Sequence, residues 1–114
     1  MTPADILARA RESGVRVRVD GQDLVIAPRQ KLTLELRVLL LHHKPELLQA
    51  LNPSTLEARI RVMAEWWHYP PEDLAYALAG AATDPAGWVE LIEADERWRA
   101  EHADLRPILG PTHA

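Results

Sequence analysis

Residues 14–28, GVRVRVDGQDLVIAP, are the one stretch of this sequence with a period of two. It begins with an alternation of valine and arginine: Val15, Arg16, Val17, Arg18, Val19. This period predicts a strand with one apolar and one basic face. Asp20-Gly21 is a turn signal before the apolar residues 24–26, so an antiparallel hairpin ending at Pro28 is predicted. A two-stranded hairpin is marginal alone, so helices must cover its valines.

The segments on either side of the hairpin have helical signals. Thr2 is an N-cap before a proline, and the apolar spacing that follows predicts a helix over 3–13. Thr33 caps a second helix that ends near His43, and Pro45 begins a short helix up to residue 51. The helix 34–43 is apolar on nearly every side, which implies that it is covered on more than one face.

The second half of the chain predicts three more helices. Ser54 to Glu57 matches a capping box at the start of an amphipathic helix over 54–67. Two prolines then begin a helix that ends at Gly80, and Asp84 caps a third helix that reaches about residue 102. From Ala103 onward the absence of periodicity predicts a loose tail, in which Ile108 and Leu109 are candidates for local docking.

The adjacent tryptophans Trp66 and Trp67 cannot both face one core, because neighbouring helical residues point about 100° apart. Trp67 continues the inward stripe of its helix. Trp66 therefore either covers a helix junction or stands partly exposed, as a tryptophan at an interface hot spot does.

Together these patterns predict an α+β fold: an αββαα module with a two-stranded antiparallel hairpin, followed by a small three-helix segment. The charge changes between the two parts. Residues 1–52 have 8 Lys and Arg against 6 Asp and Glu, whereas residues 53–114 have 5 against 11. We therefore expect two domains, 1–52 and an acidic helical segment with its tail at 53–114.

Several classes of function have no support in the sequence. The chain has no cysteine, and its adjacent histidines, His42 and His43, would point in different directions on a helix, so no metal site is predicted. Acidic pairs such as Glu72-Asp73 fit the first turn of a helix. No nucleophile-base pair or phosphate loop occurs, so we expect neither an enzyme nor a cofactor. No run approaches the roughly 18 apolar residues of a membrane span, and no secretory signal is recognisable, so a cytoplasmic location is expected.

Residues 3–51 resemble the TubC-type N-terminal docking domain of hybrid peptide synthetase and polyketide synthase assembly lines. The resemblance lies in ILARARESGVRVRVDGQDLVIAP and LTLELRVLLLHHKPELLQAL, and in their spacing. Its most specific parts are Gly14, the Asp20-Gly21 turn, and the runs 34–37 and 43–48. It implies an αββαα fold, often homodimeric, that binds a short C-terminal peptide of a partner through an exposed hairpin, without catalytic residues or a cofactor.

The hairpin carries the candidate binding residues. An exposed strand edge can accept a strand from another chain, with backbone pairing supplying affinity. We expect the basic side chains to select acidic side chains or a terminal carboxylate of that strand. The candidate partner-binding residues are Arg16, Arg18, Val25, Arg29 and Lys31.

Two other interpretations remain open at this stage. The same cations can simply solvate the outer face of the hairpin and protect its edge from aggregation. Alternatively, a basic ribbon can bind DNA, as in an accessory or regulatory protein of a bacterial or mobile-element system. A net charge of -4 disfavours nucleic acid, because the electrostatic attraction to phosphates would be small or repulsive.

Overall fold

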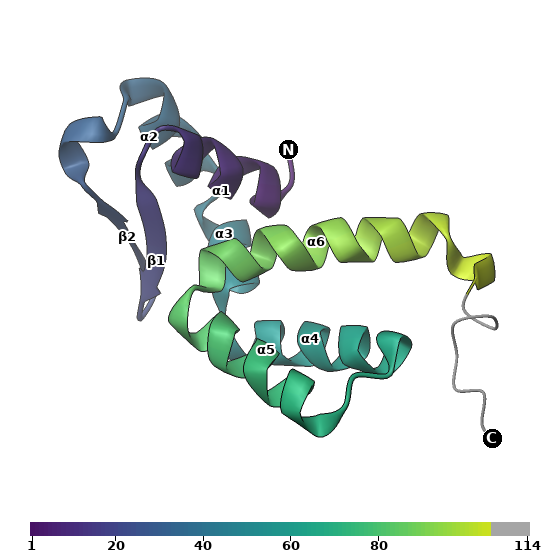
Figure 1. Cartoon of the computed structure of the whole chain (residues 1–114). Helices are drawn as coiled ribbons and strands as arrows, with labels where there is room; N and C mark the ends of the chain where they lie inside the picture. Colours follow the sequence, from purple (N-terminus) through teal and green to yellow (C-terminus); the bar gives the residue numbers. More distant parts are fainter. Residues whose placement is uncertain (106–114) are drawn as a thin grey trace, which may run out of the picture.

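The computed structural model describes residues 1–105 and is a small α+β protein (Figure 1). Within these residues, six α-helices and two short 3-10 helices accompany one antiparallel hairpin. The elements follow in this order: α1 (Pro3–Glu12), β1 (Arg16–Asp20), β2 (Asp23–Ala27), η1 (Arg29–Lys31), α2 (Leu34–His42), α3 (Lys44–Leu51), α4 (Pro53–Trp67), α5 (Pro71–Thr83), α6 (Pro85–Glu101) and η2 (Ala103–Leu105). The predicted tail positions Ile108 and Leu109 lie outside the described residues.

The hairpin has the predicted strands and a two-residue loop, Gly21-Gln22. Gly21 has a φ of 64°, a left-handed conformation that glycine adopts without a Cβ penalty. Val17 pairs with Ile26 on the face turned toward the helices, where Val17 is buried. The arginines of β1 lie on the opposite, exposed face, so the predicted division into an apolar and a basic side is confirmed.

Side-chain caps begin three helices where the sequence predicted them. Thr2 Oγ1 accepts from the amide of Asp5, and Asp5 Oδ2 accepts from the amide of Thr2, which closes a capping box on α1. These bonds lower the pKa of the Asp5 carboxyl. Thr33 caps α2 through the amide of Leu36, and Asp84 caps α6 through the amide of Gly87.

Helix α4 begins one residue earlier than predicted and has a different cap. Asn52 Oδ1 accepts from the amide of Ser54 at 2.9 Å, so Asn52 replaces Ser54 as the N-cap. Pro53 favours this start, because a proline at the first helical position has the required φ and no amide to satisfy. Glu57 is then free of a capping role and pairs with Arg61 one turn later.

Helix α5 continues through Gly80 to Thr83, although the glycine predicted its end. A Cβ at Gly80 would lie 2.6 Å from Nε1 of Trp88 on α6. The glycine therefore allows the indole of Trp88 to lie against the backbone of α5. Its role is close packing between two helices and not termination of one.

Helix α6 joins the two halves of the chain (Figure 1). It packs on α1, where Glu90 pairs with Arg11 and Glu93 accepts the amide of Ala4 at 2.9 Å. It also packs on α4 and α5. One hydrophobic cluster contains side chains from both halves, including Ile6, Leu40, Ile60 and Ile92. The first 52 residues are thus packed on the later helices through a shared core.

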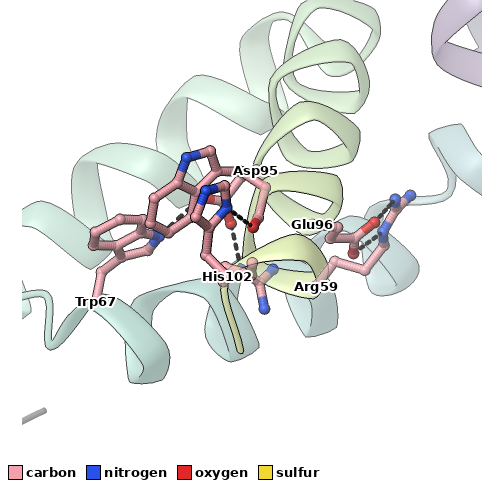
Figure 2. Close-up of polar contacts among 7 residues, drawn as sticks. Arg59, Trp67, Asp95, Glu96 and His102 are labelled. Carbon is pink, nitrogen blue, oxygen red and sulfur yellow. Dashed lines mark hydrogen bonds and ion pairs between the residues drawn. The ribbon is translucent and has the colours of Figure 1, made fainter. Parts of the chain in front are cut away.

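Polar contacts fix α4 against α6 (Figure 2). Arg59 and Glu96 form a two-point ion pair, which raises the pKa of Arg59. Trp67 donates its indole N–H to Asp95 Oδ1 at 2.8 Å, and Arg99 donates to the other oxygen of the same carboxylate. Trp66 is 6% exposed, so it belongs to the packed interior and is not an exposed hot spot.

Candidate functional site

The outer edge of β1 faces the corner where α5 meets α6. The hollow between them has a volume of about 360 Å³ and contains charges of both signs. Arg16 and Arg18 line it from the strand, and Asp84, the N-cap of α6, and Glu90 line it from the opposite side. Glu90 already accepts two bonds from Arg11, at 2.9 and 3.2 Å, and this pairing raises the pKa of the Arg11 guanidinium. The start of α6 therefore restricts access to β1.

The edge of β2 faces outward, and β1 lies between it and α6 (Figure 1). A groove of about 780 Å³ runs along this edge, with β2 as one wall and α2 as the other. Leu24 and Ile26 contribute to the first wall, and Leu34, Leu40 and Leu41 to the second. Within the described residues the sheet has only two strands, so alternate residues of β2 direct backbone N–H and C=O groups toward this groove.

Cations outnumber carboxylates along the groove. Arg29, Arg37 and Lys44 line it, whereas Asp23 is the one carboxylate among its lining residues in the described part of the chain. Lys44 Nζ lies 3.3 Å from Asp23 Oδ1, so this end near the hairpin loop is close to neutral. The excess positive charge lies with Arg29 and Arg37, and it favours an anionic occupant.

The second wall of the groove continues into an exposed apolar stripe on α2. Leu34 is 77% exposed, Val38 58% and Leu41 61%. These positions are one and two helical turns apart, so they share a face. Helices α4, α5 and α6 leave this stripe exposed, because they pack on one another and on α1, α3 and β1.

The structure divides the predicted binding residues among three places. Arg16 and Arg18 line the hollow on the β1 side, and Val25 and Arg29 line the groove on the β2 side. Lys31 lies elsewhere: its side chain crosses Gly14, whose φ is 83° and where an added Cβ would meet Lys31 Cδ at 3.0 Å. The two sides are adjacent on the outer face of the hairpin, because Arg18 is directly opposite Val25 and Arg16 is directly opposite Ala27.

Of the residues that line the groove, only Val25 and Arg29 were among the predicted binding residues; those missed include Leu34, Arg37, Leu41 and Lys44. Their spacing of three, four and three residues is that of one helical face, and it alternates apolar and basic side chains. The helical spacing of these residues can be read from the sequence. That they line a groove depends on the position of β2, which the spacing alone does not reveal.

The groove contains groups suited to binding an extended chain. It offers backbone donors and acceptors, leucine side chains and guanidinium groups. Within residues 1–105 no cluster of three or more His, Asp or Glu side chains is arranged to hold a metal ion. No helix described by the structure has the combination of length and apolar character required to cross a membrane.

No protein-family model, curated protein or solved structure matches this chain. The TubC-type resemblance of residues 3–51 therefore stays an expectation that depends on the sequence motifs.

Proposed function

We propose that this protein is a non-catalytic docking or adaptor protein that binds a short acidic segment of a partner. The segment adds to the exposed edge of β2 as a third strand. The observation that carries this proposal is the juxtaposition of an unpaired strand edge with a basic and apolar groove. An unpaired edge presents a row of donors and acceptors that another extended chain can satisfy.

The two kinds of group in the groove have different roles in this mechanism. Backbone pairing with β2 provides sequence-independent affinity and fixes the ligand as a strand. Arg29 and Arg37 provide selection, because a guanidinium forms two-point bonds with a carboxylate. The TubC-type resemblance supports the same placement, since it implies recognition of a C-terminal peptide at the hairpin.

The helical second half supports the docking surface in this proposal. Helix α6 packs on α1 and restricts access to β1, so it holds the hairpin in place and leaves β2 as the more accessible edge. The ion pair of Arg11 with Glu90 and the bond from the Ala4 amide to Glu93 fasten this support.

Titration of the isotope-labelled protein with an acidic C-terminal peptide tests the proposal, with duplex DNA in a parallel titration at physiological salt. We expect the peptide to shift the amide signals of residues 23–29 and 34–44. Arg29→Glu combined with Arg37→Glu should weaken binding by at least about tenfold. The matched control reverses two exposed arginines far from the groove, Arg61→Glu and Arg97→Glu, and should have little effect.

Two results would overturn the proposal. One is the absence of peptide-induced shifts in β2. The other is tight, salt-sensitive binding to DNA without peptide binding, which would favour the DNA-associated alternative.

A further inference from the structure

The two faces of a strand added to β2 would meet different chemistry. Successive side chains of a strand point to opposite faces of a sheet. One face of the added strand would lie over the apolar wall formed by Ile26, Leu34 and Leu41. The other would lie on the outer face of the hairpin, which carries Arg16 and Arg18.

In the structure the outer arginines line the hollow beside α6, and the register of the hairpin determines how far each would have to extend to meet a strand on the far side of β2. Arg16 is opposite Ala27 and Arg18 is opposite Val25, so short side chains separate each arginine from the β2 edge. An added strand lies about 10 Å from β1, twice the spacing of neighbouring strands. The aliphatic stem of an arginine can lie along an apolar neighbour and carry the guanidinium beyond it. A carboxylate on the outer face of the added strand can meet it there.

The inner face offers a place for large apolar side chains. Leu34 and Leu41 are largely exposed and belong to the wall of the groove. Covering them removes apolar surface from water, which favours binding by apolar residues of the ligand. A uniformly acidic strand would place carboxylates beside these leucines, so burial of their apolar surface would not contribute to binding.

We infer that the partner segment alternates acidic and large apolar residues, with the apolar set on Leu34 and Leu41 and the acidic set toward Arg16 and Arg18. This inference rests on the proposed strand addition at β2 and specifies the sequence pattern that the site selects. The pattern has a period of two, because it is imposed by the two faces of a strand.

Two hexapeptides of equal composition test the pattern: Asp-Ile-Asp-Ile-Asp-Ile and Asp-Asp-Asp-Ile-Ile-Ile, each capped at both ends. We expect the alternating peptide to bind about tenfold more tightly, because only it places both sets on their own faces. The double variant Leu34→Ser with Leu41→Ser should remove that preference. Val62→Ser, on an exposed valine of α4, should preserve it.

The outcomes separate the inference from the proposed function. Equal binding of both peptides, with shifts in residues 23–27, would overturn the alternation and leave strand addition standing. Failure of both peptides to shift those residues would overturn the two together. A preference that survives in the Leu34 and Leu41 double variant would also contradict the inference, since the apolar selection would then lie elsewhere.

Discussion

Arg18 on β1 lies directly opposite Val25 on β2, on the exposed face of the hairpin. Arg18 also lines the hollow beside α6, whereas Val25 lines the groove beside α2. This pair is therefore the link between the basic face predicted from the sequence and the accessible edge found in the structure. A side chain introduced at position 25 would therefore contact both Arg18 and a ligand at the edge of β2.

The substitution Val25→Glu should weaken binding of an acidic ligand by about tenfold or more. The new carboxylate would stand opposite Arg18, compete for its guanidinium and repel the ligand. The same cross-strand pair should leave the hairpin as stable as before or stabilise it by about 0.2–1 kcal/mol. Fluorescence anisotropy with a labelled acidic peptide measures the affinity, and thermal unfolding measures the stability.

Val25→Thr is the matched control, because threonine keeps the branched shape without a charge. It should change the affinity by much less than Val25→Glu. Equal affinities of Val25→Glu and the unsubstituted protein would show that acidic ligands do not approach this face.

The substitution Gly80→Ala should destabilise the protein, although helix propensity alone favours alanine by about 1 kcal/mol. The added methyl group would lie 2.6 Å from Nε1 of Trp88, so the indole or α5 must shift. Overpacking of this kind costs about 1–3 kcal/mol. Urea unfolding gives the sign of the change; a gain in stability would show that α5 and α6 are not packed this closely.

The substitution Asp95→Ala should destabilise the protein by about 2–4 kcal/mol. It removes the acceptor of Trp67 and the ion-pair partner of Arg99, whose side chain is 12% exposed. The Nη2 of Arg99 is already buried without a hydrogen bond within the described residues. Glu57→Ala breaks the exposed pair with Arg61 and should cost no more than about 0.5 kcal/mol. Similar losses in both variants would argue against the contacts around Asp95.

Stability should fall at alkaline pH through Tyr69. Burial raises the pKa of Tyr69, and the carboxylates of Asp95 and Asp73 raise it further. Above about pH 10 the unfolded chain releases the phenolic proton while the folded protein retains it. The unfolded state then binds fewer protons, so the free energy of unfolding decreases with pH. The contribution of Tyr69 is fully present below that pH and is lost above it.

Denaturant midpoints of Tyr69→Phe at pH 8 and above pH 10 test this dependence. The variant should lose less stability on alkalinisation than the unsubstituted protein. Tyr76→Phe is the control, because Tyr76 is 77% exposed. If Tyr69→Phe lost as much stability at alkaline pH as the unsubstituted protein, groups other than Tyr69 would be responsible for the loss.

Local signals in the sequence predicted most helices and both strands, because their causes are close together along the chain. Thr2, Thr33 and Asp84 cap the helices they precede, and the valine-arginine alternation gives β1. The predicted start of α4 was wrong because two residues, Asn52 and Ser54, are both suited to cap a helix there. Asn52 before a proline caps the helix in preference to Ser54.

Features that depend on distant residues were not predictable in the same way. Gly80 lies inside α5, where the absence of a Cβ leaves room for Trp88, eight residues later in the sequence. The groove requires β2 and α2 to lie side by side, which neither pattern specifies. Arg37 of α2 and Lys44 at the start of α3 were therefore not among the predicted binding residues, although both line the groove beside β2.

The most direct test of strand addition at β2 is an isotope-filtered NOE measurement on the labelled protein with an unlabelled, alternating acidic and apolar peptide. Strand addition at β2 predicts cross-strand NOEs between the peptide backbone and residues 23–27, with none to β1. NOEs from the peptide backbone to Arg16–Asp20, or to neither strand, would contradict it.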